Sequence, residues 1–166
     1  MNDLRPASLI LRTRRNHALE HATIAVLFER EGQRGGVAAL SDPWGFGILS
    51  SFDSDVVGEA AAEALHRLRA GQANLAITDL CGSNLIVTGV LAAVTVMVAG
   101  RGKWRNLPTA ITAAAFASVA AKPLGRWVQQ NLTTDTTGMR TLQIRSVQGQ
   151  RLSGTHTATR VNISGG

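Results

Sequence analysis

Two long uncharged segments constrain the fold of this 166-residue chain more than any other feature of its sequence. Residues 85–99 and 107–121 contain no Asp, Glu, Lys or Arg, and the short loop 101–105 that joins them carries three cations. A helix needs about 20 apolar residues to cross the hydrocarbon core of a bilayer. Trp104 lies among the cations, a combination typical of the membrane interface. The segments therefore predict a transmembrane helical hairpin over residues 83–125, with the lipid bilayer as its partner.

The composition favours the same interpretation. Charged residues make up 17% of the chain, whereas about a quarter is usual in soluble domains. The net charge of +6 lies in short clusters and lacks the basic stripe with interleaved aromatic residues that marks nucleic-acid-binding proteins. We therefore expect no nucleic-acid partner, and phospholipid head groups suit the clusters better. The alternative to a membrane hairpin is a pair of buried helices inside a soluble α+β domain.

The remaining residues predict a small α+β fold. We expect a flexible N-terminus over residues 1–12, an α+β domain over 13–82, and C-terminal strands within 126–166 that return to that domain. Apolar periodicity and turn residues such as Gly32 and Gly71 set the boundaries. The expected elements are a helix over 13–31, a β-hairpin over 37–52, a helix over 55–70, a strand over 74–78 and two strands over 141–147 and 157–163.

The first expected helix carries the chemically most informative stretch, His17-Ala-Leu-Glu20-His21. This is His-x-x-Glu-His, the inverted order of a zinc-peptidase signature. Residues one helical turn apart share a face, so both imidazoles leave the same side, with Glu20 beside them. Two imidazoles and a carboxylate are the minimum from which a catalytic zinc site can be built. The alternative is a hydrogen-bonded His/Glu cluster that fixes a buried helix in the core.

A catalytic zinc site would need a third protein ligand. Glu59, Glu63 and His66 cluster on one side of the second expected helix, opposite its apolar stripe. Glu63 is the first candidate, with Glu59 and His66 as alternatives, and a solvated helix face is the competing interpretation. Cys81, the single cysteine, is expected to be a small buried residue because no Lys, Arg or His flanks it to favour a thiolate. His156 stands alone on a loop or strand.

Three stretches carry a resemblance to a known family: Asn-His-Ala-Leu-Glu-His-Ala-Thr at 16–23, Cys-Gly-Ser-Asn-Leu at 81–85, and Pro-Leu-Gly with Gln129 and a Thr pair within 123–134. They resemble a family of small bacterial integral membrane proteins known as a domain of unknown function. The resemblance covers residues 14–147. It implies a membrane protein and no particular chemistry.

The stretch from His17 to His21 also resembles the motif of inverted-zincin peptidases of the pitrilysin and processing-peptidase type. That resemblance covers one helical turn. It implies that His17 and His21 bind zinc and that Glu20 is the general base, with a downstream helical Glu completing the site.

Two functions are therefore expected. The first is a membrane protein with a zinc-hydrolase, peptidase-like site, whose peptide substrate would align along the hairpin 37–52. The second is a non-enzymatic membrane subunit or scaffold for a membrane-protein partner, in which the His/Glu cluster is structural. The four arginines within residues 5–15 favour a cytoplasmic α+β domain, whereas the three cations of the loop 101–105 favour the opposite orientation. We expect the first orientation, in the bacterial inner membrane that the family resemblance implies.

Overall fold

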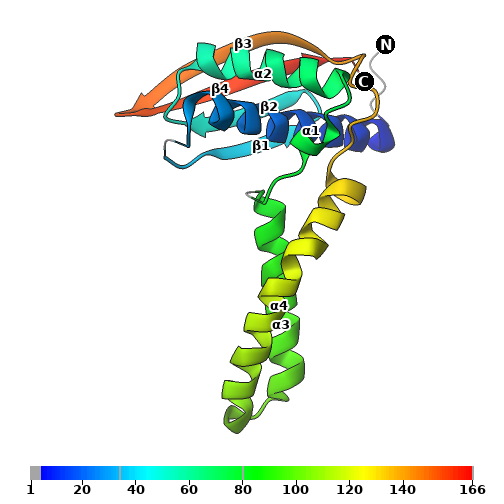
Figure 1. Ribbon diagram of the computed structural model, residues 1–166, viewed down its shortest axis with the longest axis vertical. Coiled ribbons are helices and arrows are strands. Elements are labelled where there is room, and N and C mark those ends of the chain that lie inside the picture. Colours follow the sequence, from blue (N-terminus) through cyan, green and yellow to red (C-terminus); the bar gives the residue numbers. More distant parts are fainter. Residues whose placement is uncertain (1–4, 34, 80, 166) are drawn as a thin grey trace. The chain divides into compact units, whose positions relative to one another are not determined.

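The structure is a computed structural model that describes residues 5–33, 35–79 and 81–165. The chain divides into two compact units. We call residues 1–77 with 132–166 the α+β unit, and residues 78–131 the hairpin unit. Figure 1 labels the helices and strands of both units.

The α+β unit is a four-stranded antiparallel sheet with two helices, α1 and α2, packed against each other and against the strands (Figure 1). The strand order is β1-β2-β4-β3, so the two C-terminal strands complete a sheet that the N-terminal hairpin begins. This confirms the expected α+β class. The elements are α1 (Pro6–Glu31), β1 (Ala38–Asp42), β2 (Gly45–Ser50), α2 (Ser54–Arg69), β3 (Gln143–Ser153) and β4 (His156–Ser164).

Alternation along the central strands explains why the helices cover the sheet as they do. In β4 every second residue from Thr157 to Ile163 is buried, and β2 buries Phe46 and Ile48. Period-2 alternation places such residues on one face of a sheet. The helices meet that face with small residues, among them Ala18, Ala22, Ala60, Ala61 and Ala64, all of them fully buried. Small side chains allow the helix backbones to approach the sheet and each other closely.

The β1–β2 turn depends on one glycine. Gly45 has φ 151°, and a Cβ atom built there would lie 2.0 Å from the carbonyl oxygen of Val161. The Asp42 carboxylate accepts a hydrogen bond from the backbone N–H of Trp44 at 2.8 Å and one from Arg160 at 2.9 Å. Burial opposes ionisation, but these donors outweigh it and lower the pKa of Asp42 below its ordinary value.

Two local expectations were wrong. The first helix begins at Pro6 and not at residue 13, so most of the expected flexible N-terminus is helical. Proline suits the first position of a helix because its missing N–H would have no partner there. The expected strand over 74–78 is a 3₁₀ helix, η1 (Ala73–Ala76). This run is short, and its fully buried Ala76 packs against helix α1. Among the described residues, η1 therefore adjoins helices and is not paired in the sheet.

The hairpin unit consists of α3 (Gly82–Gly100) and α4 (Leu107–Val128), which pack against each other, with the 3₁₀ turn η2 (Trp104–Asn106) between them. A π-helical turn, η3 (Gln129–Thr133), continues α4 toward the α+β unit. At the base of the hairpin the fully buried Gln129 accepts from the Thr78 N–H and donates to the Thr78 carbonyl and the Asn84 amide oxygen. These bonds fix the two ends of the hairpin together.

One helical stretch among the described residues, Trp104–Thr133, is long and apolar enough to cross a membrane, and Asn84–Gly100 is apolar but shorter. A helical hairpin is therefore present, but the expectation of two membrane-spanning helices is supported for one of them, and by length and composition alone. The stretch that qualifies contains the second of the two uncharged segments. Long core helices of soluble proteins meet the same criterion.

Candidate metal centre

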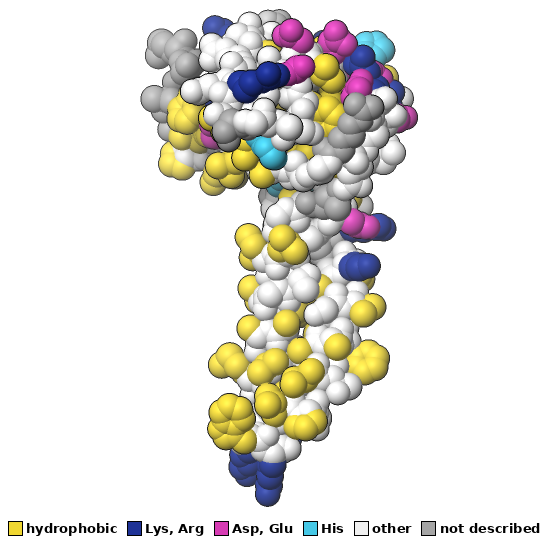
Figure 2. Space-filling view, turned by 90° about the vertical axis from the view of Figure 1, so that its left-hand side faces the viewer, with side chains coloured by type: hydrophobic (Ala, Val, Ile, Leu, Met, Phe, Trp, Pro, Cys, Tyr) yellow, Lys and Arg dark blue, Asp and Glu magenta, His cyan; other side chains and the backbone are white. Residues whose placement is uncertain are grey.

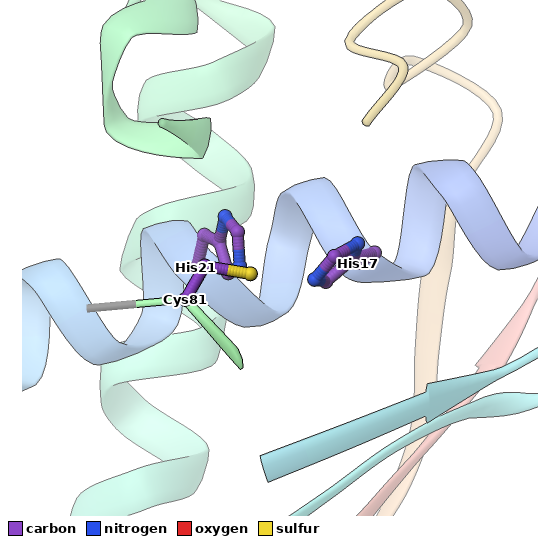
Figure 3. A group of neighbouring side chains, drawn as sticks. All are labelled: His17, His21 and Cys81. Atoms are coloured by element: carbon purple, nitrogen blue, oxygen red, sulfur yellow. The ribbon is translucent and has the colours of Figure 1, made fainter. Parts of the chain in front are cut away.

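The two motif histidines lie side by side on α1. His21 is buried, with 2% of its surface exposed, and His17 is half-buried. Their ring centroids are 4.3 Å apart, and the ring planes meet at 65°. Figure 3 shows both rings leaving the same side of the helix, as their one-turn spacing predicts.

Each imidazole is oriented by a backbone carbonyl. The distance from Nδ1 of His21 to the Ala76 oxygen is 2.8 Å, and that from Nδ1 of His17 to the Thr133 oxygen is 3.1 Å. A carbonyl oxygen only accepts hydrogen bonds, so Nδ1 of each ring carries the proton. In a neutral imidazole the lone pair then lies on Nε2, the atom available to a metal.

Each of the two carbonyls lies at the C-terminal end of a short helical turn. Ala76 is the last residue of η1, and Thr133 is the last residue of η3. Carbonyls at the C-terminal end of a helix lack intrahelical donors and carry partial negative charge. They are also the points at which the chain leaves the α+β unit for the hairpin and returns from it. The histidine pair therefore holds both junctions of the hairpin.

The return segment, residues 132–135, is tied to α1 by more than His17. The Asp135 N–H donates to the Arg14 carbonyl at 3.2 Å, and the Arg14 guanidinium donates to the Thr134 carbonyl at 3.0 Å. Arg15 forms a salt bridge to Asp135 at 3.0 Å, with only 14% and 10% of the two side chains exposed. Burial works against the charge, yet hydrogen bonds from Thr137 and Arg15 lower the pKa of Asp135 below its ordinary value.

The motif carboxylate and its neighbour Asn16 bond to β1. Glu20 is buried and accepts a hydrogen bond from the Ser41 hydroxyl at 2.5 Å. The Asn16 amide donates to the Asp42 carbonyl at 2.7 Å, while its buried Oδ1 atom has no hydrogen-bond partner among the described residues. Asn16 and Glu20 are one turn apart, so this stripe of α1 fastens the helix to the edge strand of the sheet.

The structure does not bring the expected third ligands to the histidines. Glu63 binds Arg67 and lies 3.7 Å from Arg30, and Glu59 binds Arg30 at 3.0 Å. Arg30 lies nine residues beyond His21, about 13 Å along the helix axis. These carboxylates therefore face the C-terminal end of α1. His66 is exposed on α2. The competing interpretation, a solvated ion-paired face, describes this side of α2.

Cys81, which we expected to be only a small buried residue, is also a candidate metal ligand. With His17 and His21 it forms a group that could hold a metal ion (Figure 3). Cys81 follows Ala76 by five residues, so chain connectivity alone keeps it within about 18 Å of the carbonyl that binds His21. Its place in the stretch 81–85, one of the three that carried the family resemblance, was the available signal.

Fold and site together define an α+β protein with an inserted helical hairpin and a paired-histidine candidate metal centre at the two junctions. Residues 12–147 match DUF6391, a domain of unknown function. The chain belongs to this family, as the sequence resemblance indicated. It is also similar to an uncharacterized protein of Picosynechococcus sp., with 34% identity over 140 residues that cover 75% of this chain and 67% of the relative. No solved structure matches the chain. The comparisons do not confirm the resemblance of residues 17–21 to inverted-zincin peptidases.

Proposed function

We propose that the protein is a membrane-anchored metalloprotein in which His17 and His21 hold a zinc ion that serves a hydrolytic, peptidase-like reaction. One observation carries the proposal: both rings donate from Nδ1 to backbone carbonyls, which directs the lone pair of each neutral ring to Nε2. Metal-bound histidines commonly donate their other ring nitrogen to a carbonyl or carboxylate, because this fixes the tautomer and raises ligand basicity.

The donor chemistry fits zinc. Zinc accepts imidazole nitrogen and thiolate sulfur, and catalytic sites combine three protein ligands with one open position. His17, His21 and Cys81 supply two nitrogens and one sulfur. Cys81 therefore replaces Glu63 as the first candidate for the third ligand, because Glu63 is engaged by two arginines.

Glu20 is the candidate proton acceptor. A zinc ion at the histidine pair would polarise a substrate carbonyl and favour ionisation of water. Glu20 lies next to His21 in the sequence, and the hydrogen bond from Ser41 orients its carboxylate. A carboxylate held in this way can take a proton from water and deliver it to a leaving amine.

A second function, a non-enzymatic membrane subunit or scaffold, is favoured by a different observation. Asn16 and Glu20 fasten α1 to β1, and the two histidines bind the junction carbonyls. In this alternative each polar group of the motif has a structural task, and a bound metal would stiffen the junctions without supporting a reaction.

Membrane anchoring through the hairpin is supported by its exposed apolar surface. Figure 2 shows hydrophobic side chains along the outside of the hairpin. Leu85, Ile86 and Met97 on α3 are 76%, 69% and 77% exposed, and Phe116 on α4 is 74% exposed. Apolar surface of this extent is unfavourable in water and suits contact with lipid. We place the protein in the bacterial inner membrane, with the α+β unit on the cytoplasmic side.

The zinc content of the purified full-length protein tests the proposal. We expect one zinc per chain in the wild type and none in the double variant His17→Ala/His21→Ala. The matched control is His66→Ala/His156→Ala, which also removes two histidines but from exposed positions. Equal zinc in both double variants would refute the proposed centre.

Glu20→Gln separates the two functions. If the protein is a hydrolase, this variant keeps its zinc and loses peptide hydrolysis, because the amide cannot accept the proton. In the scaffold alternative the purified wild type hydrolyses no peptide, and Glu20→Gln changes only the stability of the α1–β1 contact.

A further inference from the structure

We infer that the tip of the hairpin, residues 96–110, is a binding site for an anionic phospholipid. Lys103 and its neighbouring arginines would hold the head-group phosphate, and the groove beside them would take part of an acyl chain. The inference rests on the membrane anchoring proposed above and names the lipid class that the anchor selects.

The tip contains a groove built mostly of apolar atoms. It has a volume of about 480 Å³, and its lining includes Met97, Trp104 and Leu107 together with Lys103. Glycines at positions 100 and 102 keep it open, since they add no side chain. Trp104 is 86% exposed and Met97 is 77% exposed, so within the hairpin unit nothing covers these walls.

Charge distinguishes the tip from the base of the same hairpin. The tip carries Arg101, Lys103 and Arg105, and the sequence contains no Asp or Glu between residues 80 and 134. At the base, Arg126 has its own counterion, because it binds both carboxylate oxygens of Asp79 at 2.8 Å. The three tip cations have no acidic partner within the hairpin unit, so the anion that complements them must come from outside it. Figure 2 shows this basic group beyond the apolar surface.

The tip has a defined backbone that holds the cations in place. Arg101 has φ 48° and Gly102 has φ 68°, so both residues adopt the left-handed conformation. The Lys103 N–H donates to the Gly100 carbonyl at 2.9 Å, and the Asn106 amide donates to the same carbonyl at 3.2 Å. Arginine is disfavoured in this region and glycine is not. Strained positions of this kind are common at ligand sites, and here the strained residue presents one of the three charges.

An anionic phospholipid matches both features, whereas an inorganic anion matches only one. The cations attract a phosphate group, and the apolar groove beside them can bury a hydrocarbon chain. Trp104 stands between two of the cations in the sequence and also lines the groove, which suits the interfacial place of tryptophans between head groups and acyl chains. The charge and the groove together therefore select an amphiphile with an anionic head.

Fluorescence of Trp104 tests this inference in the full-length chain. The reporter carries Trp44→Phe and Trp127→Phe and is reconstituted into phosphatidylcholine vesicles. A minor fraction of the lipid is acyl-brominated, either phosphatidylglycerol or phosphatidylcholine. We expect stronger quenching by brominated phosphatidylglycerol, corresponding to about a fivefold enrichment of that lipid for each engaged cation.

Two matched lysine variants locate the effect. Lys103→Gln should weaken the preference for phosphatidylglycerol, whereas Lys122→Gln, near the other end of α4, should leave it unchanged. The triple variant Arg101→Gln/Lys103→Gln/Arg105→Gln should abolish it. Equal quenching by both brominated lipids, or a preference that survives the triple variant, would overturn the lipid site while leaving the anchor intact. Absence of quenching by either lipid would refute the membrane anchor as well.

Discussion

The two units of the chain differ in the exposure of their large apolar side chains. In the α+β unit Leu19, Phe46 and Val57 are fully buried between helices and sheet. In the hairpin unit Met97 and Phe116 are more than 70% exposed although they belong to the most apolar part of the chain. The first unit forms a core of its own, as a domain in water must. The described part of the second unit leaves such side chains exposed, as the membrane anchor proposed above requires.

Polar groups show the same division. In the α+β unit, His21 bonds to a backbone carbonyl, and the Glu20 and Asp135 carboxylates bond to other side chains of the unit. At the hairpin tip the cations have no such acidic partner in the hairpin unit. Groups that a protein satisfies internally contribute to stability, and groups that it presents outward are available for recognition. The polar groups of the α+β unit therefore stabilise its fold, whereas the cations of the hairpin tip are available to bind an anion.

The largest expected effect on the free energy of unfolding comes from truncating a buried phenylalanine, compared with truncating an exposed one. Phe46→Ala removes a fully buried ring and should lower the free energy of unfolding by about 4 kcal/mol, because it leaves a cavity in the core. Phe116→Ala removes an exposed ring and should leave unfolding of the α+β unit unchanged. Denaturant unfolding of the detergent-solubilised full chain measures both. Equal losses would remove the distinction between the two units.

The next effect concerns the return segment. Asp135→Asn should lower the free energy of unfolding by about 2 kcal/mol, because it leaves the largely buried Arg15 without its counterion. Asp53→Asn is the control, since its salt bridge to Arg151 is exposed, and it should cause little change.

The pH dependence of stability follows from the lowered pKa of Asp135. The folded pKa lies below the ordinary value of 3.8, so this contribution is present above that value and is lost as the pH falls through the folded pKa. The Asp135→Asn variant should lack this acid-limb loss. If wild type and variant lose stability in parallel below pH 4, the salt bridge does not have the assigned role.

The smallest expected effect is a gain in stability. Arg101→Gly should stabilise the hairpin by about 1 kcal/mol, because glycine adopts the left-handed conformation at φ 48° without strain. Arg105→Gly removes the same charge from the helical turn η2, where glycine is unfavourable, and should destabilise it. Thermal unfolding followed by helical circular dichroism measures both. A change of the same sign in both variants would show that charge, and not backbone strain, determines the stability of the hairpin.

The fold could be predicted where the pattern is local. The apolar periodicity and the capping residues of α2 indicated its span closely, and the uncharged segments indicated a helical hairpin. The start of α1 was missed because residues 1–12 were expected to be flexible, although Pro6 suits the first position of a helix. The 3₁₀ turn η1 resembled a strand because a run so short does not reveal its period.

The candidate site was less accessible to sequence reasoning. The spacing of His17 and His21 fixed their shared face, and that expectation was confirmed. Their partners are the carbonyls of Ala76 and Thr133, and backbone acceptors have no signature in a sequence. The expectation for Glu63 depended on where α2 lies beside α1, and the structure places Arg30 at that carboxylate. Such choices are made by tertiary packing.

Nitrogen NMR of the two imidazole rings tests the central claim most directly. In the detergent-solubilised full chain without metal, His17 and His21 should both carry the proton on Nδ1, because each Nδ1 donates to a carbonyl oxygen. Addition of zinc should then shift the Nε2 resonances of both rings and leave Nδ1 protonated. Protonation on Nε2 in the metal-free protein, or Nε2 resonances unmoved by zinc, would contradict the proposed centre.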